Sequence, residues 1–143
     1  MSRGIIPEGV WILDEAHSRK LVPASVTLWI IRDDGERLIW VGVETSYAGE
    51  ISINTFDGVY GGEPAIVHGC EFSVSLSSPA PRTVRVEGDI PNMGPFSETT
   101  VISPDRCRMR VDGQVLVGDQ AKQWYEEFEW FGPIPLAQRG DRS

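Results

Sequence analysis

Alternation of apolar and polar residues with a period of two runs through most of this chain, from Ser25 onward. This is the pattern of strands that bury one face and expose the other. Turn sequences rich in Gly, Pro, Asp and Asn separate the runs, and no long amphipathic helix is available to connect parallel strands. Roughly eight to ten short strands joined by tight turns predict an all-β, antiparallel up-and-down meander. Closing the meander into a small barrel would protect its two edges.

Alternation and turn residues together place the individual elements. The expected strands span residues 25–31, 37–46, 50–56, 71–76, 83–90, 96–102, 106–117 and 122–131, with a bent or edge strand within 59–69. Asp57 and Gly58 are expected to close a hairpin, since glycine tolerates the positive φ of tight turns, and Gly113 to form a bulge. One short helix is expected from Asp14 to Lys20, where acidic residues lead and basic residues follow.

Length and composition suit one domain with a real core, since the chain has 143 residues of which 41% are hydrophobic. The expected division is an N-terminal segment, 1–8, a barrel domain, 9–131, and a C-terminal tail, 132–143. The first residues lack the apolar stretch of a signal peptide, and no apolar run reaches the roughly 18 residues of a membrane span. Cys70 and Cys107 have no metal-type spacing. We therefore expect a cytoplasmic protein with two reduced thiols.

The formal net charge of −8 disfavours two classes of partner. Nucleic acids and anionic membrane surfaces both attract basic proteins, so neither is expected to bind this chain. The one basic cluster consists of Arg106, Arg108 and Arg110, whose spacing predicts one solvated outer face of a strand. An anion contact on that face is the alternative.

Several motifs resemble those of a family of small bacterial lipocalin-like proteins, which open with a Gly-x-Trp-x-Leu strand, a short Ser-containing helix and a Pro-x-Ser-x-Thr strand. The matching segments here are 9–14 with Ser18, 23–27, the turn at 33–35, 56–58 with Pro64, the turn at 103–105 and the aromatic last strand. The resemblance covers residues 9–131 and implies a lipocalin-like barrel. Most members have no assigned activity, so it implies no particular ligand.

The last expected strand offers the sharpest candidate for a functional residue. Glu126 shares a strand face with Trp124, Phe128 and Trp130. A carboxyl group among large aromatics would be desolvated, which raises its pKa and suits proton transfer. We therefore expect Glu126 to point into the barrel between Trp124 and Phe128. The alternative is a solvated position at the barrel mouth or exterior, and a bulge nearby would give the role to Tyr125 and Glu127.

Other candidates are weaker. His68 follows an apolar run at a glycine-rich bend and could act as a general base, or simply bind a backbone partner. Tyr60 and Tyr125 could orient a substrate carbonyl or pack in the core. The expected ligand-binding residues are Trp11, Trp40, Glu44, Phe56, Met109, Trp124, Phe128 and Trp130. Glu98 lies between Phe96 and Thr100 on one strand face, where a surface position is the simpler expectation.

Two functional classes fit these residues. The first is a cofactor-independent enzyme, of isomerase, cyclase or lyase type, acting by acid/base chemistry on a small aromatic, polyketide or terpenoid substrate. The second is a non-catalytic carrier of a small hydrophobic ligand. The chain has no phosphate-binding loop, nucleophile elbow or zinc-protease motif, and its two histidines exclude a histidine-rich metal site within one chain. No cofactor or metal is expected, and a homodimer is left open.

Overall fold

The structure is a computed structural model that describes residues 4–20 and 26–134. Its described part consists of ten strands and one short 3-10 helix, η1. The elements are β1 (Gly9–Leu13), η1 (Glu15–His17), β2 (Val26–Asp33), β3 (Arg37–Thr45), β4 (Ile51–Val59), β5 (Ala65–Val67), β6 (Phe72–Ser77), β7 (Thr83–Ile90), β8 (Gly94–Ile102), β9 (Arg108–Val117) and β10 (Gln120–Gly132). The predicted all-β fold is confirmed.

The strands form one antiparallel sheet in the order β4-β3-β2-β1-β10-β9-β8-β7-β6-β5. The first strand pairs with the last, which places Trp11 opposite Trp130 and Leu13 opposite Phe128. The two sheet ends, β4 and β5, meet through an isolated bridge in which Thr55 and His68 exchange backbone hydrogen bonds of 3.0 and 2.9 Å. The meander is therefore a nearly closed barrel, as the need to protect its edges predicts.

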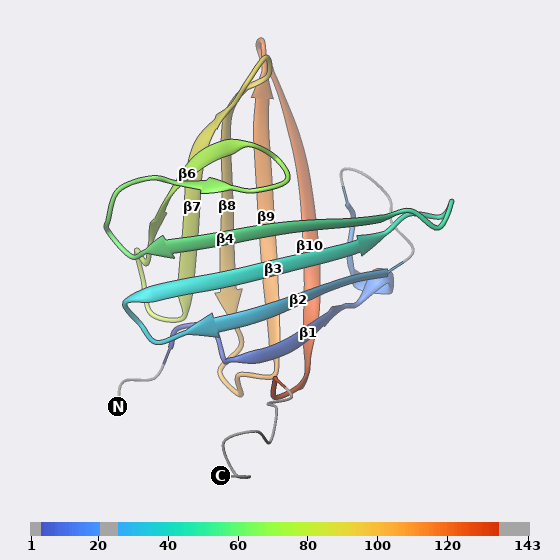
Figure 1. The fold of residues 1–143 in the computed structure, drawn as a ribbon, viewed down its shortest axis with the longest axis vertical. Coiled ribbons are helices and arrows are strands. Elements are labelled where there is room, and N and C mark those ends of the chain that lie inside the picture. Colours follow the sequence, from blue (N-terminus) through green and yellow to red (C-terminus); the bar gives the residue numbers. More distant parts are fainter. Residues whose placement is uncertain (1–3, 21–25, 135–143) are drawn as a thin grey trace, which may run out of the picture.

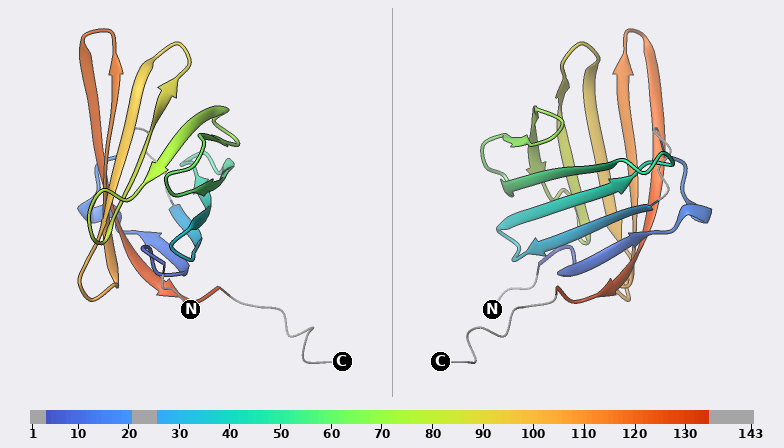
Figure 2. Two further views of the ribbon diagram at one scale, coloured as in Figure 1. Left: turned by 90° about the vertical axis from the view of Figure 1, so that its left-hand side faces the viewer. Right: turned by 45° about the vertical axis from the view of Figure 1, so that its right-hand side comes forward.

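The barrel is flattened into two facing layers. Figure 1 shows β1–β4 crossing in front of β7–β10, and Figure 2 shows the two layers from the side. Side chains from both layers fill one end of the interior, where Trp11, Ile31, Val111 and Phe128 are fully buried. Burial of these large apolar side chains supplies the main stabilisation of the fold.

Two glycines serve a different purpose from the one expected. Gly58 was expected in a hairpin turn, but β4 continues through it to Val59 and the chain turns afterwards. Gly113 was expected at a bulge, but it pairs with Trp124 in an unbroken register. A Cβ at Gly58 would overlap the ring of Phe56, and one at Gly113 would overlap the indole of Trp124. Both expectations were wrong because each glycine makes room for an aromatic ring instead of a turn or bulge.

Three further expectations about the chain need correction or restriction. The helix expected from Asp14 to Lys20 is only the single turn Glu15–His17. Arg106 does not share a strand face with Arg108, because it lies in the preceding turn with a φ of 64°. The expected strand start at Ser25 and most of the expected tail, from 135 to 143, lie outside the described residues. Within the described residues, no helix is both long and apolar enough to cross a membrane.

Candidate functional site

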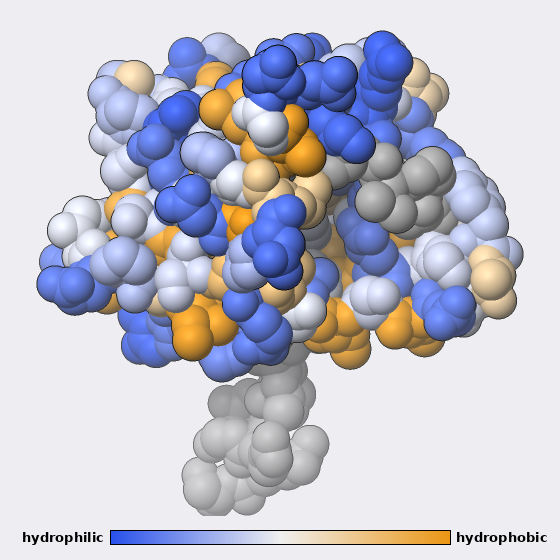
Figure 3. All heavy atoms as spheres, turned by 90° about the horizontal axis from the view of Figure 1, so that it is seen from above, coloured by the Kyte–Doolittle hydropathy of each residue, from blue (hydrophilic) through white to orange (hydrophobic). Residues whose placement is uncertain are grey.

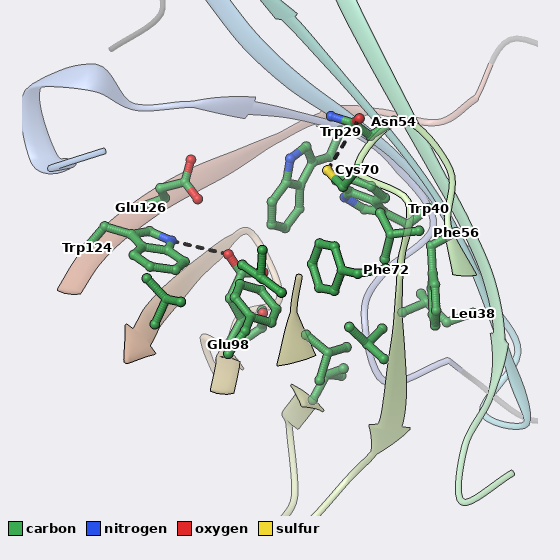
Figure 4. A pocket seen from close by; sticks show the side chains of 18 of the residues that line it. Trp29, Leu38, Trp40, Asn54, Phe56, Cys70, Phe72, Glu98, Trp124 and Glu126 are labelled. Carbon is green, nitrogen blue, oxygen red and sulfur yellow. Dashed lines mark hydrogen bonds between the residues drawn. The ribbon is translucent and has the colours of Figure 1, made fainter. Parts of the chain in front are cut away.

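A cavity of about 410 Å³ lies inside the barrel, between the two layers. Aromatic and aliphatic side chains make up most of its lining, and Figure 4 shows many of them pointing into the same space. Figure 3 shows the molecule from above, with apolar residues near the middle of the visible face and hydrophilic residues around them. A volume of this size falls in the usual range of small-molecule sites.

Aromatic rings in mutual contact build the walls of the cavity. Trp29 meets Trp40 edge to face at a centroid distance of 5.5 Å and lies 4.2 Å from the ring of Phe128. Phe96 lies between Phe72, at 5.3 Å, and Trp124, at 5.9 Å. Such ring pairs fix one another's orientation as well as burying area. The walls are therefore preorganised for a flat apolar molecule.

Strand glycines make room for three aromatic rings of the cavity lining. Gly42 lies beneath the indole of Trp40, as Gly58 does beneath Phe56 and Gly113 beneath Trp124. In each case a side chain at the glycine would occupy the position of the ring. The glycines therefore let each ring lie down along the sheet.

Lys20 is the centre of a polar cluster in the cavity lining. Its Nζ donates to Glu44 Oε1 at 2.7 Å and to Thr27 Oγ1 at 2.9 Å, and it lies 3.3 Å from Glu126 Oε2. The lysine side chain is 10% exposed and that of Glu126 is 8% exposed. A buried lysine needs such partners because an isolated charge would lose its hydration without compensation.

Glu98 is a third carboxyl group of the lining, on the opposite strand layer from Glu44, and it accepts a hydrogen bond of 3.2 Å from Trp124 Nε1. The surface it retains faces the cavity. Burial, and then the negative charge of Glu126, raise the pKa of Glu98 to about 8, against the opposing effects of Trp124 and Lys20. Burial also raises the pKa of Glu126, although Lys20 offsets part of that effect. Glu98 is therefore mainly protonated at neutral pH.

The structure brings together some of the residues expected at a site. Of these, the cavity lining contains Trp40, Glu44, Phe56, Trp124 and Glu126. Glu126 points inward and pairs with a cation, which is one of the outcomes expected for a buried carboxyl group. Its role in chemistry remains a prediction.

The remaining expected residues lie elsewhere. Trp11, Met109 and Phe128 are buried in the core below the cavity, and Trp130 is 38% exposed and donates to the Glu8 carbonyl. Three further candidates, His68, Tyr60 and Tyr125, also lie outside the cavity lining. His68 is exposed at the β4–β5 bridge. The Tyr60 hydroxyl donates to Asp33 Oδ2 at 2.8 Å, and Tyr125 lies on the outer face with Arg110 4.5 Å above its ring.

Sequence reasoning missed Lys20 and undervalued Glu98 and Trp29. Glu98 carried a usable signal, because it shares a strand face with Phe96 and the buried Thr100. Trp29 lies on the inward face of β2 together with Thr27 and Ile31, which are both buried. The opposite face of β2 is equally apolar, but it points outward, as the half-exposed Val26 shows. Lys20 carried no local signal, since only the closed barrel brings it to Glu44 and Glu126.

Within 4–20 and 26–134, no group of three or more His, Cys, Asp or Glu residues is arranged to hold a metal ion. Cys70 and Cys107 are free, and Cys70 Sγ lies 3.6 Å from Asn54 Oδ1 at the cavity lining. Comparisons with protein-family models, with curated proteins and with solved structures found no match. The geometry thus defines the molecule as a nearly closed β-barrel whose interior could hold a small ligand.

Proposed function

We propose that the barrel binds a small, flat, largely apolar molecule and moves a proton on it, as a cofactor-independent isomerase, cyclase or lyase. One observation carries the proposal. Two carboxyl groups with raised pKa values, Glu98 and Glu126, line the same aromatic-walled cavity. Moving a proton on a ligand needs one side chain that donates a proton and another that accepts one. Their surroundings must therefore give the two side chains different pKa values. Relationship to the lipocalin-like family remains part of this proposal.

The different surroundings of the two carboxyl groups assign the roles. Burial and the negative charge of Glu126 raise the pKa of Glu98, despite the hydrogen bond from the Trp124 indole, so Glu98 keeps its proton at neutral pH and can donate it. Glu126 has the ammonium of Lys20 beside it, which favours the ionised form and suits a proton acceptor. The mostly apolar lining lowers the polarity around both groups, which strengthens both interactions.

A carrier is the second candidate, and the dominance of apolar side chains in the lining favours it. A purely structural domain is less well supported, because such a barrel would be filled. Binding itself is tested by titrating the neutral fluorophore N-phenyl-1-naphthylamine. Val86→Phe, which fills the cavity, should abolish the fluorescence increase, and Val101→Phe, on the outward face of β8, should leave it unchanged. Equal binding by both variants would place the probe outside the barrel.

Proton transfer is tested with 5-nitrobenzisoxazole, a flat aromatic compound. A base removes its carbon-bound proton, the N–O bond breaks, and a coloured cyanophenolate forms. Glu126 should act as the base, and protonated Glu98 should donate to the phenolate that forms, so the rate should fall as the pH rises through about 8. Glu98→Gln should lower the rate at least about tenfold, equivalent to roughly 1.4 kcal/mol. Glu87→Gln, an equal charge change at an exposed position of β7, is the control. A rate unaffected by Glu98→Gln would refute Glu98 as the proton-transfer group.

A further inference from the structure

The polar groups of the cavity do not balance in charge. Three carboxyl groups, Glu44, Glu98 and Glu126, line it together with one ammonium group, that of Lys20. Lys20 already forms ion pairs with two of them, since its Nζ lies 2.7 Å from Glu44 Oε1 and 3.3 Å from Glu126 Oε2. Among the ion pairs of the described residues, none involves Glu98. Glu98 is therefore the one carboxyl group of this described lining that no cation pairs.

The opposite wall suits a cation as well. Figure 4 shows Glu98, Glu126 and Trp124 on one side of the cavity and Trp29, Trp40 and Phe72 across from them. The faces of indole and phenyl rings carry negative charge density and attract cations, most strongly when water is excluded. A positive group between these walls would meet a carboxyl group on one side and ring faces on the other.

We propose that the ligand is an amine: an aromatic or other flat apolar body bearing an ammonium group that pairs with Glu98 and contacts the indole walls. This inference rests on the binding part of the proposed function, because it concerns the same cavity, and it names the ligand class. With an amine bound, Glu98 pairs with the ammonium group instead of acting as the proton donor. An anionic ligand would face three carboxyl groups. A neutral ligand could form only a hydrogen bond with Glu98, which is weaker than an ion pair in this lining.

Pairing with an ammonium group requires Glu98 to lose its proton. Free Glu98 is mostly protonated near pH 7, so binding of an already protonated amine releases that proton to solvent. The groups that face Glu98 are Glu126 and Trp124 on β10, Lys20 after η1, and Cys70 before β6. Glu44 completes the charged set through Lys20. Glu126 and Glu44 are negative neighbours, so they favour the cation further.

The test uses three probes with one ring system and different charge: 1-naphthylmethylamine, 1-naphthalenemethanol and 1-naphthoate. Isothermal titration calorimetry near pH 7, in phosphate and in Tris, measures both affinity and proton release. We expect the amine to bind at least about tenfold more tightly than the alcohol, and the naphthoate most weakly, with release of close to one proton for the amine alone. Glu98→Gln should equalise the amine and the alcohol and abolish proton release. Glu87→Gln, with the same change in net charge, should behave like the parent.

The outcomes separate this inference from the proposed function. Equal affinity for the amine and the alcohol, or tighter binding of the naphthoate, overturns the amine inference and leaves the binding function intact. Amine binding without proton release, or with release that persists in Glu98→Gln, overturns the role of Glu98. Failure of all three probes to bind contradicts both proposals.

Discussion

Removing Lys20 gives the most direct test of the polar cluster. Lys20→Met keeps the length and apolar stem of the side chain but deletes its ammonium group. Glu126, whose side chain is 8% exposed, then loses the cation that lies 3.3 Å from it. Glu44 suffers less, because its side chain is 37% exposed and water can replace the lysine.

The expected loss follows from the burial of these groups. Breaking a buried ion pair by removing one partner costs about 3–5 kcal/mol, because a charge remains buried without compensation. Glu126 borders a cavity and can relax or take up a proton, so the lower end applies. We expect Lys20→Met to lower the free energy of unfolding by about 3 kcal/mol near neutral pH.

The stability loss caused by Lys20→Met should depend on pH. Burial raises the pKa of Glu126, and loss of Lys20 removes an interaction that lowers it. A carboxyl group with a raised pKa in the folded state binds a proton there as the pH falls, which relieves the penalty. The loss should therefore be smaller near pH 5 than near pH 7. The double variant Lys20→Met/Glu126→Gln should recover most of it, because no unpaired charge remains.

Urea unfolding followed by tryptophan fluorescence measures these differences. Lys122→Met, at an exposed position of β10, is the matched control and should change stability by less than about 0.5 kcal/mol. The reasoning is refuted if Lys20→Met costs no more than this control. It is also refuted if the loss is the same at both pH values, or if the double variant is no more stable than Lys20→Met.

Three further predictions concern the cavity wall. Glu98→Gln should match the parent in stability near pH 4, below the unfolded pKa of the glutamate, where its carboxyl group is mainly protonated in both the folded and the unfolded chain. Near pH 9 it should exceed the parent by at least about 1.4 kcal/mol in urea unfolding, because ionising Glu98 costs the folded state free energy. A stability difference that is the same at both pH values would contradict the raised pKa. Gly113→Ala should destabilise by about 1–3 kcal/mol and red-shift tryptophan emission, because its Cβ displaces the Trp124 indole, whereas Gly132→Ala, with open space around it, should do neither. Glu126→Gln should fold with stability equal to or above that of the parent and lose at least about tenfold in probe affinity or turnover, and unchanged binding and turnover would remove Glu126 from the site.

Local sequence patterns predicted the strands well because strand structure depends on short-range features. Alternation set the faces of β6 to β10, and Pro, Gly, Asp and Asn marked most turns. Glycine was the residue type whose role these local patterns predicted wrongly. A glycine in an alternating run can either make a turn or make room for a ring, and Gly58 and Gly113 do the second. Local sequence could not show the role of Gly113, because its ring, Trp124, comes from the neighbouring strand. Gly58 did carry a local signal, because its ring, Phe56, lies two residues earlier on the same strand.

The sequence by itself determined an all-β meander, the placement of Glu126 and Trp124 on one strand face, and an acidic, aromatic-rich chain. Only the tertiary structure decided which candidates meet. Pairing of β1 with β10 joins the two layers into one sheet, and the bridge between Thr55 and His68 brings the sheet ends together around one cavity. The register of β8, β9 and β10 places Glu98 beside Trp124, and the bridge between Arg19 and Tyr125 brings Lys20 to Glu126. His68 lies exposed, outside the cavity lining. These contacts span many residues of chain, so they depend on strand order and register, which periodicity within a single strand does not encode.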